Sequence, residues 1–179
     1  MKSILAAAAV AGVIAAAPAA AQVINLNAQT TTTYAPYTQL LGAGIYQVFD
    51  VGTADAVGAL YDAWNPWGST GGGGCDTGGA NCTWGWYRRW YMDFGSGEVG
   101  NNSSFFASAA LALASAKTDD PHSFTLLAPT TVKFWIADSP YTDNTGGVSL
   151  SIAAVPEPET WGLLLAGLGL LGVAARRRA

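Results

Sequence analysis

The chain has 179 residues, a length that predicts one domain; 50% of the residues are hydrophobic and only 11% are charged. The formal net charge is −4, and this acidic balance argues against nucleic-acid binding, which needs a basic face. One histidine and two cysteines supply few ligands or nucleophiles, so most classes of metalloenzyme are disfavoured.

Residues 1–21 have the pattern of a secretory signal peptide. Lys2 precedes a short, alanine-rich apolar run, and Ala19 and Ala21 form the Ala-x-Ala pattern of a cleavage site. We expect cleavage between Ala21 and Gln22. The shortness of the run disfavours a permanent membrane helix. Export would place the rest of the chain in an oxidising compartment.

The region 22–154 is expected to fold as one antiparallel β-sandwich of the jelly-roll type, an all-β fold. Segments in which apolar and polar residues alternate recur along it, separated by turn signals. The clearest are 22–27, 44–49, 123–127, 131–136 and 148–152. Residues 105–117 fit a strand by alternation and a helix by alanine content. We predict an extended segment there, with a helix as the open alternative.

Glycine dominates residues 68–79, which predicts a long surface loop. Cys75 and Cys82 flank the second half of this loop and are the only cysteines of an exported chain, so we expect them to form a disulfide. Closing the loop would stabilise the fold by about 2–3 kcal/mol.

Five of the seven tryptophans lie between residues 64 and 90. They could be core residues, with alternate rings such as Trp84 and Trp86 facing inward. They could instead form an aromatic platform that stacks on sugar rings, and both readings stay open. On the second reading, Asn65, Arg88 and Arg89 could bond sugar hydroxyls. The candidate ligand-binding residues are Tyr61, Asp62, Trp64 and Trp67.

Asp138, Asp143 and Asn144 lie in the turn between two predicted strands and form a candidate calcium site. Two carboxylates, an amide and turn carbonyls are ligands that Ca²⁺ prefers, although the same residues are common in plain hairpin loops. The segment 141–152 resembles the C-terminal calcium loop of galactose-binding, calcium-dependent jelly-roll lectins. The resemblance implies that these three side chains hold a calcium ion that also binds sugar hydroxyls.

The C-terminal segment 155–179 begins with Pro156, Glu157 and Pro158, and continues through an apolar stretch to an arginine cluster. A transmembrane helix is expected over about 158–175, with Trp161 near its start and Arg176, Arg177 and Arg178 after it. The stretch from residue 161 to residue 175 is about 22 Å of helix, so spanning needs flanking residues or a thinned bilayer.

This order of motif, helix and arginines resembles the PEP-CTERM sorting signal. The resemblance implies recognition by an exosortase, a membrane protease-transpeptidase that removes the segment near the Pro-Glu-Pro motif. It further implies export and inner-membrane anchoring before processing, followed by a place at the cell surface or outside the cell, often alongside exopolysaccharide.

We therefore expect an exported, exosortase-processed protein that binds carbohydrate or exopolysaccharide, such as a galactoside-type glycan, with calcium and without catalysis. One alternative is a structural protein of the extracellular matrix that has no ligand. A second is an enzyme acting on polysaccharide, which would need folding to bring together two carboxylates such as Asp62 and Asp93.

Overall fold

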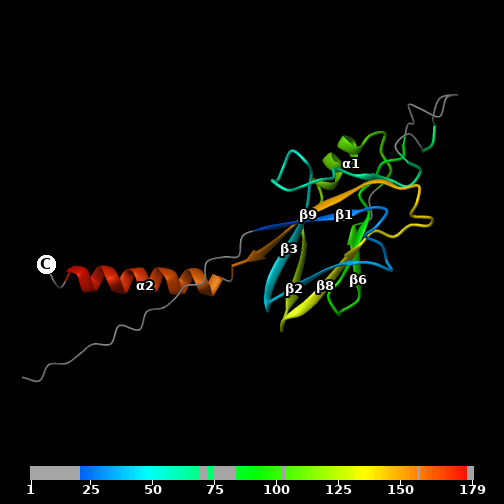
Figure 1. Cartoon of the computed structure of the whole chain (residues 1–179). Helices are drawn as coiled ribbons and strands as arrows, with labels where there is room; N and C mark the ends of the chain where they lie inside the picture. The colour runs from blue at the N-terminus through cyan, green and yellow to red at the C-terminus, as the bar shows by residue number, and fades with distance from the viewer. Residues whose placement is uncertain (1–20, 69–71, 75–83, 102–103, 157, 177–179) are drawn as a thin grey trace, which may run out of the picture. The chain divides into compact units, whose positions relative to one another are not determined.

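The computed structural model describes residues 21–68, 72–74, 84–101, 104–156 and 158–176 (Figure 1). The predicted signal peptide up to residue 20, the two cysteines and Arg177 and Arg178 lie outside the described residues. The elements are β1 (Gln22–Asn27), β2 (Tyr37–Leu41), β3 (Gly44–Val51), β4 (Trp64–Asn65), β5 (Trp90–Asp93), β6 (Glu98–Asn101), α1 (Ala109–Ala116), β7 (His122–Leu126), β8 (Thr130–Trp135), β9 (Thr145–Val155) and α2 (Pro158–Arg176).

The strands form two antiparallel sheets. One has the order β1–β9–β3–β7, with the short β4 added to β9, and the other has the order β2–β8–β5–β6. The pairing is nested along the chain: β1 pairs with β9, β2 with β8, β3 with β7, and β5 with β6. This is the strand order of a jelly roll. The predicted all-β antiparallel sandwich is confirmed.

Alternation along the strands produces the core between the sheets. Ile24 and Leu26 of β1 are buried while their neighbours are half-buried, and Val132 and Phe134 of β8 repeat the pattern from the other sheet. Trp90 fills the middle with no exposed surface. Each such side chain contributes about 1.5–3 kcal/mol by leaving water, so the alternation fixes which face of each strand turns inward.

Residues 109–116 form the helix α1, so the prediction of an extended segment over residues 105–117 was wrong. Five of the eight helical residues are alanine, which has the highest helix propensity. The hydroxyl of Ser108 caps the helix by accepting a hydrogen bond from the Leu111 amide at 3.3 Å. Ala112 and Ala116 are the buried side.

A buried ion pair lies between the sheets. Arg88 has no exposed surface, and its Nε donates to Oδ1 of Asp50 at 2.9 Å. Its other nitrogens donate to three main-chain carbonyls, those of Asp62, Val51 at 3.2 Å and Ser149 at 2.9 Å. The guanidinium therefore replaces its lost hydration with partners from several segments.

The second oxygen of Asp50 accepts a hydrogen bond from Nδ2 of Asn101 in β6, at 3.1 Å. Burial raises the pKa of the Asp50 carboxyl, while the charge of Arg88 and these hydrogen bonds act in the opposite direction. Because Asp50 belongs to β3, the ion pair and this amide connect the two sheets.

The Asp50→Ala substitution is expected to lower the free energy of unfolding by about 3–5 kcal/mol, because it leaves a buried guanidinium without its anion. Urea denaturation of the chain and of the variant measures this difference. Lys117→Met is the matched control, since it removes the exposed ion pair with Asp55 and should cost less than about 1 kcal/mol. Equal losses in the two variants would contradict the role given to Asp50.

Candidate functional site

The loop between β8 and β9 is held against two other segments. Nδ2 of Asn144 donates to the carbonyl of Ala28 at 2.9 Å, and Nε2 of Gln29 donates to the carbonyl of Asn144 at 2.7 Å. On the other side, the amide of Gly147 donates to the carbonyl of Ala63 at 3.2 Å. The acidic loop is therefore fixed between the segment after β1 and the segment before β4.

The chain that leaves β4 runs along the same loop. β4 pairs with the first residues of β9, Trp64 opposite Gly146 and Asn65 opposite Thr145. A Cβ atom placed on Gly68 would lie 3.6 Å from the carbonyl oxygen of Asp143. Residues 64–68 and residues 143–146, far apart in the sequence, are thus neighbours.

Three aromatic rings come together just beyond β4 and remain partly open to solvent. Trp67, Trp84 and Phe105 are 46%, 39% and 42% exposed, and we call them the aromatic patch. Their ring centroids are 5.3–5.5 Å apart in all three pairings. The patch rests on buried rings, because Phe105 packs on Tyr87 at 4.5 Å and Tyr87 on Trp64 at 4.3 Å.

The structure places the four ligand candidates predicted from the sequence in different environments. Trp67 is in the patch, whereas Trp64 is fully buried and therefore packs in the core, where it cannot stack on a ligand. The Tyr61 hydroxyl accepts a hydrogen bond from Asn27 at 3.0 Å. The carboxylate of Asp62 accepts two from Thr53.

Two patch residues were not assigned to the ligand site from the sequence. Trp84 lies within the aromatic run, but alternation suggested an inward ring, and the structure leaves it 39% exposed. Phe105 lies outside that run, and no sequence signal pointed to it. Arg88, considered as a donor to sugar hydroxyls, is instead fully buried in the ion pair, because its charge is matched by Asp50.

The three candidate calcium ligands differ in burial, and Asp138 is half-buried. Asp143 is exposed, and Asn144 is fully buried. Among the described residues, Oδ1 of Asn144 is a buried oxygen with no hydrogen-bond partner. Burial raises the pKa of Tyr87 to about 12, and the charge of Asp138 adds to this rise.

The described residues contain no group of three or more histidine, cysteine, aspartate or glutamate side chains that could hold a metal ion. An ion at this loop would therefore have to be held mainly by amide and main-chain oxygens. Such oxygens are ordinary calcium ligands, and the orphaned Oδ1 of Asn144 is one of them. Asn144 therefore supplies one oxygen of the kind that calcium binds.

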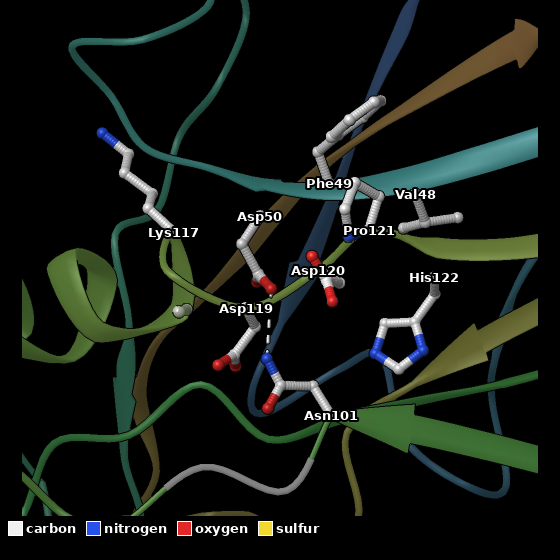
Figure 2. Close-up of a pocket in the computed structure, with 10 residues that line it drawn as sticks. Val48, Phe49, Asp50, Asn101, Lys117, Asp119, Asp120, Pro121 and His122 are labelled. Atoms are coloured by element: carbon white, nitrogen blue, oxygen red, sulfur yellow. Dashed lines mark hydrogen bonds between the residues drawn. The ribbon is translucent and has the colours of Figure 1, made fainter.

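A separate small pocket of about 90 Å³ lies between β3, β7 and the end of α1, as Figure 2 shows. Asp50, Asn101, Asp119, Asp120 and His122 are among the residues that line it. Its one buried carboxylate, that of Asp50, already binds Arg88 and Asn101. The pocket therefore offers no free buried acid to a ligand.

The two carboxylates considered for an enzyme each serve a local turn. Oδ1 of Asp62 accepts hydrogen bonds from the amide and hydroxyl of Thr53, and Oδ1 of Asp93 accepts one from the amide of Gly95 at 2.7 Å. Asp93 thus holds the turn after β5, and Asp62 holds the loop after β3.

The predicted C-terminal helix forms as α2, Pro158–Arg176. Within the part of the chain that the structure describes, no helix has both the length and the hydropathy to cross a membrane. The expected transmembrane helix over about 158–175 stays a prediction.

Gly146→Ala is expected to destabilise the fold by more than about 1 kcal/mol. Gly146 has φ +85°, and an added Cβ would lie 2.4 Å from the carbonyl oxygen of Ala63. Gly58→Ala is the control, because Gly58 has φ +89° but no atom within 4 Å of an added Cβ. Thermal unfolding of both variants measures the difference, and an equal loss would show that the contact with β4 is unimportant.

Comparison with known proteins adds one finding. Residues 154–178 match the family model of the PEP-CTERM protein-sorting motif. No curated protein and no solved structure matches the chain, so the resemblance to calcium-dependent lectins has no support from relatives. The predicted sorting signal is confirmed: the chain carries a PEP-CTERM motif at its C-terminal end and is an exported protein sorted by an exosortase.

Proposed function

We propose that this exported, exosortase-sorted protein binds carbohydrate through the aromatic patch, with calcium held by the adjoining loop. The observation that carries the proposal is the patch itself: three rings in mutual contact that remain 39–46% exposed. A folded domain usually buries side chains of this size, and a cluster left open is typical of a binding surface.

Sugar rings suit such a surface. A pyranose has a face of C–H groups that packs on a flat aromatic ring, while its hydroxyls stay at the edge and need polar partners. Trp67 is followed by Gly68, which lies against the Asp143 carbonyl, so polar oxygens adjoin the rings. The patch would bind the apolar face, and the loop would bind hydroxyls.

The loop itself supports calcium through one specific feature. Oδ1 of Asn144 is buried without a hydrogen bond, which is costly unless a further partner satisfies it. With the exposed carboxylate of Asp143 beside it, this oxygen would form part of the ligand set, and Asp138 would add charge from the same loop. When bound, a calcium ion would coordinate sugar hydroxyls directly.

We further propose that the protein binds rather than catalyses. The acids considered for hydrolysis, Asp62 and Asp93, hold local turns, and the buried Asp50 holds Arg88. An exopolysaccharide outside the cell is the ligand class that agrees with a sorted surface protein. The signal peptide at residues 1–21 and anchoring in the inner membrane before processing belong to the same proposal.

Trp67→Ala should weaken binding to isolated exopolysaccharide about tenfold or more, because it removes one ring of the patch. Tryptophan fluorescence titration measures the affinity, with galactose as a small-sugar comparison. Tyr34→Ala is the control, since Tyr34 is 90% exposed and is not part of the patch. If the unaltered protein binds neither, the ligand-free structural function is favoured over this proposal.

Calorimetric titration of the protein with calcium should show saturable binding that Asp143→Ala weakens at least tenfold. Asp143 is exposed, so the substitution should leave the fold intact. Asp120→Ala, an equally exposed acid in another loop, should have no effect. Bound calcium should also stabilise the fold by about 2.7 kcal/mol at a hundredfold excess over Kd, and this gain should raise the melting temperature. Identical titrations for the two variants would remove calcium from the proposal.

A further inference from the structure

We propose that the last three residues of β9, Ala153–Val155, must leave β3 before the exosortase can process this chain. We call them the β9 end. The inference rests on the sorting function. It identifies the segment that the sorting enzyme must bind, which is a strand end paired with β3 in the folded domain.

No linker separates the domain from the sorting motif. β9 ends at Val155 and α2 begins at Pro158, so only Pro156 and Glu157 lie between strand and helix. The matched motif starts at residue 154, inside the strand. Even when fully extended, two residues span at most about 7 Å, which is too short for an enzyme to surround the chain beside a folded domain.

An enzyme that takes an extended peptide generally pairs with its backbone over several residues. Upstream of the Pro-Glu-Pro motif, the backbone groups available for such pairing belong to the β9 end. In the folded domain one edge of the β9 end is hydrogen-bonded to β3, in the antiparallel pairs Gln47 with Ala153, Tyr46 with Ala154 and Ile45 with Val155. An enzyme that encloses the chain on both edges therefore cannot bind the β9 end while β3 occupies one of them.

The β9 end is held in a way that allows it to leave. On its other side β1 begins at Gln22, opposite Ile152, so among the described strands β3 alone pairs with these three residues. Their side chains are partly exposed, whereas Ile152 is 4% exposed and belongs to the core. Release can therefore proceed as far as Ile152 without opening the core.

The expected population of the released state follows from this geometry. Opening breaks only a few ladder hydrogen bonds, and terminal segments of a fold open more readily than the core. We expect the β9 end to be free in between about one molecule in ten and one in a thousand. Processing of the folded protein should be slowed by the same factor.

A linker tests this directly. An insert of six residues, alternating glycine and serine, between Val155 and Pro156 should speed removal of the C-terminal segment about tenfold or more. The assay mixes the purified, folded full-length chain with membranes from an exosortase-containing bacterium and follows the mass of the product. The control places the same insert between Leu127 and Ala128, in the exposed turn after β7, and should leave the rate unchanged.

A cross-strand lock gives the opposite perturbation. The pair Gln47→Cys and Ala153→Cys, once oxidised and checked by mass spectrometry, should stop processing, and reductant should restore it. The pair Thr38→Cys and Lys133→Cys, opposite each other on β2 and β8, is the control and should not affect the rate.

Each outcome decides the matter. Equal rates for the unaltered and linker-bearing chains, or undiminished processing of the oxidised lock, would overturn the role of the β9 end. Failure of every chain to be processed would instead overturn the sorting function on which the inference rests.

Discussion

The structure depends on placing one positive charge, that of Arg88, where water cannot reach it. A buried guanidinium is tolerated only when paired and hydrogen-bonded, because desolvation of the charge costs several kcal/mol. Arg88 precedes β5 of one sheet, and its partners Asp50 and Ser149 belong to β3 and β9 of the other. A further bond, to the carbonyl of Asp62, brings the segment before β4 to the same point. The ion pair thus fixes the distance between segments that hydrophobic packing alone would leave adjustable.

The position of the aromatic patch follows from this arrangement. Tyr87, next to Arg88 in sequence, forms two backbone hydrogen bonds with Trp64, at 3.1 and 2.9 Å, and their rings are in contact. Trp64 in turn pairs with the start of β9. Phe105 packs on the buried ring of Tyr87 and on Trp67, so core side chains support the exposed part of the cluster. Support of this kind lowers the entropy lost on binding.

The sequence predicted secondary structure correctly where the residues fitted only one periodicity. The alternation in residues 22–27 predicted β1 with its observed bounds, and the other alternating segments overlap β3, β7, β8 and β9. The pattern failed at α1, because alternating alanine and leucine fits both periods and only the cap at Ser108 and alanine propensity decide between them. The sequence pattern also did not predict the burial of Arg88 or the exposure of Phe105, because both depend on residues that are distant in the sequence. The position of Asn144 in a turn was predictable, but the burial of its amide oxygen was not.

β9 connects the acidic loop to the sorting motif. Its first residue, Thr145, follows the acidic loop and pairs with β4, and its last, Val155, lies within the matched sorting motif. Eleven strand residues at about 3.3 Å each separate these points by more than 30 Å. Between them Val148, Leu150 and Ile152 are buried in the core and hold the strand in register. On the proposals made above, release at the sorting end would stop at Ile152 and leave the acidic loop in place, so a single strand would serve an enzyme at one end and a ligand at the other.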